Sequence, residues 1–222
     1  MNPLRIIKRF LDKILGAKAD ELFWKFHHFF DKDWAQSYIS DGSLNHLHRK
    51  LLVEKISEYS PLKNVLEVGS ASGPNLYLLA NKFPKTNFYG IDISASAIYQ
   101  GKHFLEKHGK KNVFLRMASI FQLEDFKDKS MDIVFSDAVL LYVGPNKVVS
   151  VLKEMIRVAK KAIILCEQHT SDESFYDDKW IHNYHQVIEK NIPNAKINFT
   201  KIIGEIWQGD WVKYGYIIEV IL

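Results

Sequence analysis

The sequence has little cysteine and no long apolar runs. Its 222 residues include one cysteine, Cys166, so an intramolecular disulfide is excluded. Cys166 follows the apolar run 162–165, and we interpret it as a buried strand thiol of a cytoplasmic protein. No apolar run approaches the roughly 20 residues of a membrane-spanning helix. Residues 1–15 mix charged with apolar side chains, so we expect no signal peptide there.

A strong charge of one sign is also missing, as are internal repeats and low-complexity segments. The formal net charge of +4 gives little support for a nucleic-acid partner. With 47% hydrophobic and 25% charged residues, the composition is that of an ordinary globular protein. The length fits one domain with a small appendage. We predict an N-terminal helical extension over residues 1–60 and one α/β domain over residues 61–222.

Strand and helix patterns alternate from residue 64 onward. Short apolar runs predict strands over residues 64–68, 87–92, 113–117, 131–136 and 162–167. Amphipathic segments between them predict helices over residues 74–83, 94–108 (ended by Gly109) and 145–159. This alternation predicts right-handed crossovers and a parallel sheet. Residues 196–206 and 212–222, on either side of a turn at 208–210, predict an antiparallel hairpin at the end of the domain.

The N-terminal extension is rich in aromatic and basic residues. Apolar residues within 1–15 recur at helical spacing with basic residues between them, which predicts a basic amphipathic helix. Such a helix packs on its own domain or on a second subunit in a homodimer, or it makes a peripheral membrane contact. The aromatic segment 23–30 fits a core or an interface. The adjacent His27 and His28 point in different directions on a helix, so we expect no metal there.

The most informative segment is 64–74. A short apolar strand leads into a loop of small residues between Gly69 and Gly73, and a proline then suits the first turn of a helix. Glu67 precedes this loop, and Asp92 ends the next predicted strand. A glycine loop followed by a strand-end acid is typical of a nucleoside-cofactor site, in which the acid bonds the ribose hydroxyls. The glycines alone would also fit a simple tight turn; the two acids favour the cofactor site.

The acid before the loop distinguishes between cofactors. Dinucleotide loops of the form G-x-G-x-x-G place a helix N-terminus against a pyrophosphate. Glu67 would repel a pyrophosphate but attract the ammonium of an amino-acid moiety, which counts against a nicotinamide-dependent dehydrogenase. The pattern E-x-G-x-(G/A)-x-G, followed by G-I-D at 90–92, resembles motifs I and II of the class I S-adenosylmethionine (SAM) methyltransferases. Ala71 stands where that family often has its middle glycine, so we expect Ala71 to need no positive φ.

The resemblance covers roughly residues 65–165 and implies a Rossmann-like fold. It implies a seven-stranded, mostly parallel sheet with an antiparallel C-terminal hairpin. It also implies that SAM is the cofactor, with Asp92 on the ribose hydroxyls. Near the adenine amine, a serine replaces the acidic residue that the family often has, and it can form that hydrogen bond more weakly. The expected cofactor-binding residues are Glu67, Gly69, Ser70, Ala71, Gly73, Asp92, Ile93, Ser119 and Ile120.

Three residues are candidates for catalysis. Asp137 ends the fourth strand and either reaches SAM or the substrate or caps its loop. Tyr142 stands where the family often has a histidine and is either a catalyst or an aromatic of the core or the pocket wall. His169 follows the fifth strand and is either a general base or a solvated loop histidine. Asp132 begins its strand, far from the chemistry, and is expected to be structural.

The segment 171–191 is expected to be an insertion on the acceptor side of the site. Its His182 and His185 share a helix face, but no nearby cysteine or acidic motif completes a metal site, so we expect no metal. The sequence therefore predicts a SAM-dependent transfer of a methyl group to an O or N atom of a small-molecule acceptor. A sugar or glycan-pathway intermediate is one such acceptor. The alternatives are an RNA or protein methyltransferase and a SAM-binding partner subunit without catalysis.

Overall fold

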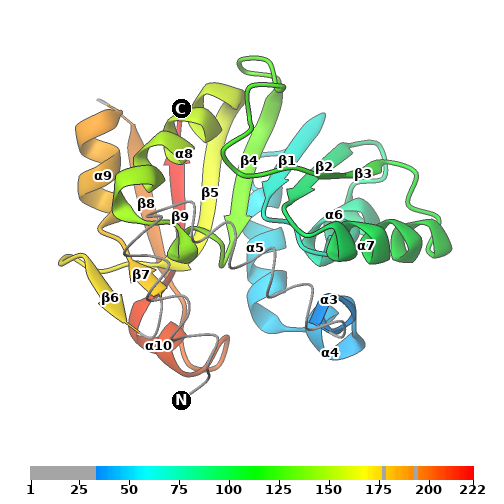
Figure 1. Cartoon of the computed structure of the whole chain (residues 1–222), viewed down its shortest axis with the longest axis horizontal. Helices are drawn as coiled ribbons and strands as arrows, with labels where there is room; N and C mark the ends of the chain where they lie inside the picture. The colour runs from blue at the N-terminus through cyan, green and yellow to red at the C-terminus, as the bar shows by residue number, and fades with distance from the viewer. Residues whose placement is uncertain (1–33, 177–178, 193–194) are drawn as a thin grey trace.

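The computed structural model describes residues 34–176, 179–192 and 195–222. In this part of the chain a seven-stranded sheet has the order β3-β2-β1-β4-β5-β9-β8 (Figure 1). The parallel strands are β1 (Asn64–Val68), β2 (Asn87–Asp92), β3 (Val113–Met117), β4 (Met131–Asp137) and β5 (Ala159–Gln168). The antiparallel pair is β8 (Lys196–Lys201) and β9 (Gly215–Ile221), and β9 also pairs antiparallel with β5. The predicted Rossmann-like, mostly parallel sheet is confirmed.

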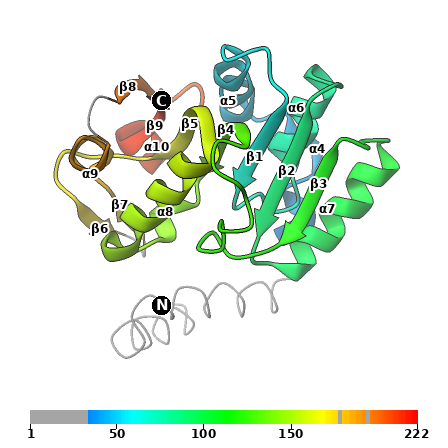
Figure 2. The ribbon, with the colours of Figure 1, turned by 90° about the horizontal axis from the view of Figure 1, so that it is seen from above.

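Helices cover both faces of the sheet. One face packs against α5 (Leu47–Ser57), α6 (Pro74–Lys82) and α7 (Ala95–Lys107), and the other packs against α8 (Pro145–Val158) and α9 (Tyr184–Asn191). Seen from above, α8 lies on the opposite side of the sheet from α5 and α6 (Figure 2). Strands buried on both faces need apolar residues at successive positions. Val134 and Phe135 of β4 show this, because they enter the two different cores.

Local signals set most element boundaries. Pro74 occupies the first turn of α6, and the Ser94 side chain caps α7 by accepting a hydrogen bond from the Ala97 N–H. Gly109, which follows the C-cap His108 of α7, has φ +67°, as expected for the glycine that ends a helix. The structure corrects the C-terminal hairpin in two respects, and the first is that β8 ends at Lys201 rather than at residue 206. Residues expected at the start of its second strand form the helix α10 (Asp210–Tyr214), and β9 begins only afterwards.

The connection between β8 and β9 is wide because its aromatic residues pack on one another. Lys201 of β8 pairs with Tyr216 of β9, so the residues between them form a loop rather than a tight turn. Within this loop the Trp207 and Trp211 rings stack with their centroids 3.8 Å apart. This contact accounts for the helical turn that replaces the expected strand residues.

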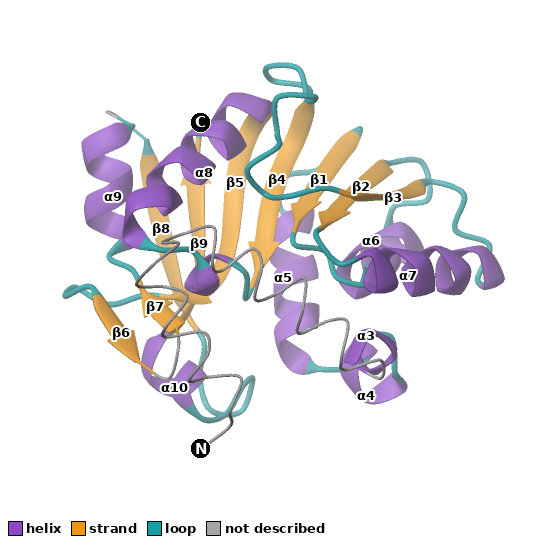
Figure 3. Cartoon of the chain, viewed as in Figure 1, coloured by secondary structure: helices purple, strands orange, loops and turns teal. Residues whose placement is uncertain are grey.

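The short elements gather at one end of the sheet. They lie around the carboxyl ends of the parallel strands, where an open α/β sheet places its ligands (Figure 3). These elements are α3 (Trp34–Ser37), α4 (Asp41–Leu44), the 3-10 helix η1 (Leu140–Tyr142) and α10, with the hairpin of β6 (Ser174–Tyr176) and β7 (Lys179–Ile181). The hairpin belongs to the predicted insertion, and β7 packs against η1.

The described part of the N-terminal extension is helical and packs on the domain. Helix α3 contacts α7, and both α4 and α5 contact α6. The predicted amphipathic helix within 1–15 and the aromatic segment 23–30 lie outside the described residues. The membrane contact and the homodimer assigned to them stay predictions. In the part of the chain that the structure describes, no helix is long and apolar enough to cross a membrane.

Candidate functional site

The loop after β1 turns sharply because two glycines adopt left-handed backbone conformations. Gly69 has φ +74° and Gly73, directly before α6, has φ +76°. The N–H groups of Gly69 and Ser70 both donate to the Ile91 carbonyl, at 2.8 and 2.9 Å. A Cβ at position 69 would collide with the Val139 side chain. A side chain larger than hydrogen therefore fits neither the backbone conformation nor the space at position 69.

Ala71 departs from the sequence-based expectation. It has φ +46°, so the prediction that it needs no positive φ is wrong. A left-handed conformation costs a residue with a Cβ roughly 1–2 kcal/mol. The Ala71 N–H donates to Asp92 Oδ2 at 2.8 Å, and this bond helps to hold the strained turn. Position 71 thus requires a left-handed backbone conformation, as the neighbouring glycines do.

Glu67 is buried, and only one of its two carboxylate oxygens has a hydrogen-bond partner among the described residues. Its Oε1 accepts a hydrogen bond from Asn75 Nδ2 at 2.7 Å, whereas its Oε2 has no hydrogen-bond partner among the described residues. Burial raises the pKa of Glu67 well above its usual range, with Asn75 opposing this shift. The buried Ser70 hydroxyl also lacks a partner in this part of the chain. The loop therefore presents two unsatisfied oxygens beside a left-handed backbone.

Asp92 ends β2 and braces the loop. Its Oδ2 accepts from Ala71 N and its Oδ1 from Ser94 N, each at 2.8 Å. Burial raises the pKa of Asp92, although the hydrogen bonds from Ser94 and Ala71 act in the opposite direction. The carboxylate can still accept a hydrogen bond from a ligand. Sequence reasoning assigned this acid to a ribose alone and missed its role in holding the loop.

The predicted adenine-side residues follow β2 and β3. Ile93 is partly buried directly after Asp92. Ser119 is buried, and its Oγ accepts from the Phe121 N–H at 3.3 Å. Ile120 is partly buried and packs against the core under α8. These residues lie beside the glycine loop because β1, β2 and β3 are neighbouring parallel strands.

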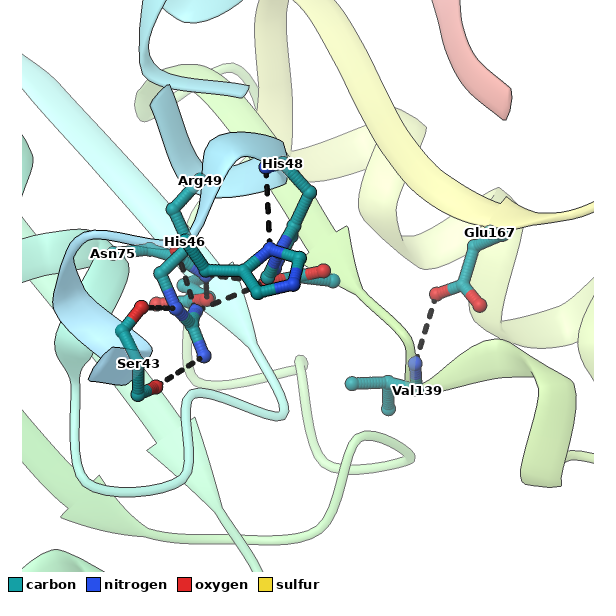
Figure 4. A network of polar contacts seen from close by, with 9 residues as sticks. Ser43, His46, His48, Arg49, Asn75, Val139 and Glu167 are labelled. Carbon is teal, nitrogen blue, oxygen red and sulfur yellow. Dashed lines mark hydrogen bonds and ion pairs between the residues drawn. The ribbon is translucent and has the colours of Figure 1, made fainter. Parts of the chain in front are cut away.

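Asp137 forms the centre of a buried polar cluster, and its partners His48, Arg49 and Asn75 are labelled in Figure 4. Its Oδ2 contacts His48 Nε2 at 3.1 Å, Arg49 NH1 at 3.2 Å and Asn75 Nδ2 at 2.9 Å. Burial alone would raise the pKa of Asp137, but His48, Arg49 and Asn75 hold it well below its usual range. Asn75 Nδ2 also reaches Glu67, so an acid near the end of β1 and the acid that ends β4 share one network.

Arg49 attaches the N-terminal helices to this network. Its NH1 donates to Asn75 Oδ1 at 2.7 Å, and its Nε donates to the Ser43 carbonyl at 3.0 Å. At the next turn of the loop, the Ser72 hydroxyl donates to the Ala35 carbonyl at 2.7 Å. The described part of the extension is therefore fixed to the glycine loop. Sequence reasoning missed Arg49 because it belongs to no motif and lies 88 residues before Asp137.

His169 lies in a different environment from Asp137. Its Nδ1 accepts from the Tyr184 N–H at 3.2 Å, and its half-buried ring packs against Phe199 and Tyr216. Burial lowers the pKa of His169. Among the described residues, no hydrogen bond joins His169 to the Asp137 cluster. The structure thus places these two predicted residues at the same edge of the sheet without bringing them together.

Glu167 is a buried acid beside the site that sequence reasoning missed. It is buried at the end of β5, where its Oε1 accepts from Ser136 Oγ at 2.8 Å and from the N–H groups of Val139 and Leu140 at 3.0 Å. Its Oε2 accepts from Leu141 N at 3.3 Å. Burial raises the pKa of Glu167 to about 7. An acid directly after a run of apolar strand residues was the signal that could have found it.

His182 also contacts the segment 139–143, which Glu167 contacts from β5. Its Nε2 lies 3.2 Å from the Leu140 carbonyl oxygen and 2.9 Å from that of Val143, and its Nδ1 lies 3.2 Å from Glu173. The segment 139–143 carries the predicted Tyr142, which is partly buried in η1. Two buried side chains, from β5 and from the insertion, therefore fix the loop that faces Gly69.

Comparison with known proteins gives the family. Residues 60–218 match a family model described as a methyltransferase domain, so the chain belongs to that family. A curated relative, the tRNA (guanine-N(7)-)-methyltransferase of Oceanobacillus iheyensis, is 25% identical over 111 residues, which is 47% of this chain and 51% of the relative. The chain spans about half the length of the curated relatives it matches.

Solved structures agree with the family. The magnesium protoporphyrin IX methyltransferase of Synechocystis, crystallised with SAM, has a TM-score of 0.66 at 16% identity and covers 91% of this chain and 96% of its own. The N-terminal domain of EvdMO1, crystallised with S-adenosylhomocysteine and D-fucose, has a TM-score of 0.60 at 18% identity, covering 80% and 83%. Family and fold together define a class I SAM-dependent methyltransferase domain, whose cofactor is SAM.

The residues present fit this cofactor. The unpartnered Glu67 Oε2 is a buried acceptor of the kind that an ammonium group requires. A dinucleotide pyrophosphate would instead meet two acids, Glu67 and Asp137, that share one network. The donor and acceptor set therefore matches an amino-acid moiety joined to a nucleoside.

Proposed function

We propose that this chain transfers a methyl group from SAM to an oxygen or nitrogen atom of a small-molecule acceptor. The observation that carries this proposal is the buried Glu67, whose Oε2 is unpartnered among the described residues and which lies beside the left-handed loop 69–73. Membership of the methyltransferase-domain family supports the reaction class.

In this proposal, Glu67, the loop 69–73 and Asp92 hold the cofactor. Glu67 binds the ammonium, and the loop from Gly69 to Gly73 encloses the amino-acid portion. Asp92 takes the ribose hydroxyls with its remaining lone pairs while it braces Ala71. When bound, SAM supplies an electrophilic methyl group. The chain's own contribution is to hold the acceptor atom in attacking geometry, which can lower the barrier by several kcal/mol.

We infer the acceptor class from the elements that surround the carboxyl ends of the parallel strands. Helices α3 to α5, the hairpin β6–β7 and α10 enclose this edge with helices and aromatic side chains. Such an enclosure suits a small molecule better than a nucleic-acid duplex. Two structural neighbours are associated with small molecules: one is a magnesium protoporphyrin IX methyltransferase, and the other was crystallised with D-fucose. We therefore favour a small acceptor and retain a sugar as one candidate.

The curated relative that methylates tRNA supports a second candidate function. An RNA acceptor requires a basic surface, and its binding weakens steeply with salt. The net charge of +4 is modest for this purpose. Binding of a bulk tRNA pool at 50 and 200 mM salt distinguishes the two acceptor classes. Tight, salt-sensitive binding of tRNA together with its methylation would show that the acceptor is an RNA rather than a small molecule.

Calorimetry with the full chain tests the cofactor assignment. We expect SAM and S-adenosylhomocysteine to bind and NAD not to bind. Glu67→Gln should weaken SAM binding at least about tenfold because the hydrogen bond to a charged group is lost. Glu106→Gln, at an exposed position on α7, is the matched control and should bind normally. Binding of NAD without SAM would refute the assignment. Panels of monosaccharides, phenols and amines, assayed for S-adenosylhomocysteine formation, then identify the acceptor.

A further inference from the structure

The carboxylate of Glu167 holds the start of the 3-10 helix η1. Its Oε1 accepts hydrogen bonds from Val139 N and Leu140 N, each at 3.0 Å, and its Oε2 accepts one from Leu141 N at 3.3 Å. The first N–H groups of a helix have no partner within the helix itself. Figure 4 shows Glu167 reaching from the end of β5 toward the Val139 N–H. A side chain of one strand therefore fixes the backbone that follows the neighbouring strand β4.

This backbone needs partners outside its own segment because it is strained. Ala138, directly after β4, has φ +58°, a left-handed conformation that residues with a Cβ rarely adopt. The Ala138 N–H donates to the Cys166 carbonyl at 2.9 Å. The hydroxyl of Ser136, at the other side of the turn, donates to Glu167 Oε1 at 2.8 Å. Strained backbone persists only where the surrounding structure determines it, and β5 does so here through the Cys166 carbonyl and the Glu167 side chain.

Val139 connects this segment to the loop that follows β1. A Cβ placed at position 69 would lie 2.3 Å from Val139 Cγ2 and 2.7 Å from Val139 Cγ1. The Val139 side chain therefore occupies the space beside Gly69, whose backbone has the left-handed φ of +74°. The strands that lead into the two loops are also paired, since Val68 lies opposite Ser136. The loops after β1 and β4 are thus in contact through Gly69 and Val139.

Glu167 and His182 hold different groups of the same segment. His182 Nε2 lies 2.9 Å from the Val143 carbonyl oxygen and 3.2 Å from that of Leu140. The insertion therefore fixes carbonyl groups of the segment, whereas Glu167 fixes its N–H groups. The N–H of Val139 donates to Glu167, so Glu167 is the side chain that determines where Val139 lies against Gly69.

We propose that Glu167 is a positioning residue for SAM, which acts through Val139 by holding the segment 138–141 against Gly69. The inference rests on the proposed function, since it takes the loop 69–73 as the cofactor site. Glu167 itself contacts neither the cofactor nor the acceptor. Its hydrogen bonds form this wall of the site before SAM arrives, which lowers the cost of binding. Where the segment is displaced, the affinity for SAM falls with the fraction of molecules that keep the arrangement.

Two replacements of Glu167, studied in the full chain by calorimetry with SAM, separate the acceptor oxygen from the length of the side chain. Glu167→Gln keeps an acceptor where Oε1 lies, so we expect its SAM affinity to stay within about threefold of the parent. Glu167→Met has a similar length but no oxygen, which leaves the N–H groups of residues 139–141 without this partner. We expect its SAM affinity to fall at least about tenfold. Glu124→Gln, at an exposed position, is the matched control and should bind SAM as the parent does.

A double-mutant cycle of SAM affinity tests whether Glu167 acts through Val139. Val139→Ala should weaken SAM binding at least about fivefold, because it removes the two methyl groups beside Gly69. Adding Glu167→Met to Val139→Ala should cost no more than about a further twofold beyond the more affected single variant, because both changes act on one contact. Losses that multiply would overturn the inference. Where Glu167→Met does not fold, Val139→Ala decides: an affinity within about twofold of the parent would leave Glu167 no route to the loop and would also overturn it.

Steady-state kinetics with the best acceptor of the panel distinguish positioning from a loss of folded protein. We expect Glu167→Met to raise the KM for SAM and to keep kcat within about threefold of the parent. A variant that merely folds less well has a lower kcat and an unchanged KM, and this result would overturn the inference. A parent that binds no SAM would instead contradict the proposed function. If the parent binds SAM and Glu167→Met binds it equally well, the inference fails and the proposed function stands.

Discussion

Replacing Glu167 with glutamine should change how the stability of the protein depends on pH. Glu167 is fully buried and accepts hydrogen bonds from the Ser136 hydroxyl and from the N–H groups of Val139, Leu140 and Leu141. Despite these donors, burial raises its pKa from an ordinary 4.5 to about 7. The folded protein therefore binds a proton at this site over a pH range in which the unfolded chain does not.

The sign and size of the effect follow from this difference. The folded state binds more protons between about pH 4.5 and 7, so Glu167 contributes less to stability as the pH rises through this window. With one pKa unit equal to about 1.36 kcal/mol, the contribution should fall by about 2.5 kcal/mol between pH 5 and pH 8. A glutamine at this position keeps the acceptor at Oε1 and does not titrate. It loses only the longer bond to Leu141, which costs about 1 kcal/mol.

Urea denaturation of the parent and Glu167→Gln at pH 5, 6, 7 and 8 measures the difference. We expect the variant and the parent to be about equally stable at pH 5, where about 0.8 kcal/mol of the parent's stability is already lost, and the variant to be more stable at pH 8 by about 2.3 kcal/mol. Taking the difference between the two proteins removes the titration of all other groups. For Glu124→Gln, at an exposed position, the difference in stability from the parent should not change between pH 5 and pH 8. A difference in the free energy of unfolding between the parent and Glu167→Gln that stays constant from pH 5 to pH 8 would refute the reasoning.

Two further substitutions test the strained loop and the structural acid. Ala71→Gly should raise the free energy of unfolding by up to about 1 kcal/mol with SAM affinity preserved, because glycine adopts φ +46° without strain; a clear loss of stability would show that Ala71 is not strained. Asp132→Asn should destabilise by about 1.5–3 kcal/mol, because Asp132 Oδ2 accepts from the N–H groups of Lys63 and Asn64. Calorimetry should find its SAM affinity unchanged, and a weakened affinity would place Asp132 in the binding machinery.

The sheet was predictable because its signals are local. Strands β1, β2 and β3 begin and end where the sequence predicted, since each is a short apolar run bounded by turn residues. The same signals placed Glu67 and Asp92 at strand ends on one edge. The wide connection before β9 was not predictable, because the stacking of Trp207 on Trp211 decides it and leaves no periodic pattern.

The cluster around Asp137 was not predictable for a different reason. His48 and Arg49 reach Asp137 across 89 and 88 residues of sequence, and no motif links the helix α5 to the end of β4. Their pairing depends on how the N-terminal helices pack on α6. The identity of Asp137 as an ionised acid, rather than a loop cap, follows only from these partners. For the same reason, the sequence favoured His169 as the base, since His169 follows a strand that local signals could locate.

Four acids show how tertiary contacts separate residues that look alike in sequence. Glu67, Asp92, Asp137 and Glu167 each lie at or beside the carboxyl end of a parallel strand, and all are buried or nearly so. Asp137 has its pKa lowered by its cationic neighbours, whereas burial raises the pKa of the other three. Asp137 has a cationic partner in Arg49, whereas the buried Glu67 Oε2 has no partner among the described residues. An ammonium at Glu67 would supply that positive charge, which is why the edge suits a cationic cofactor better than a pyrophosphate.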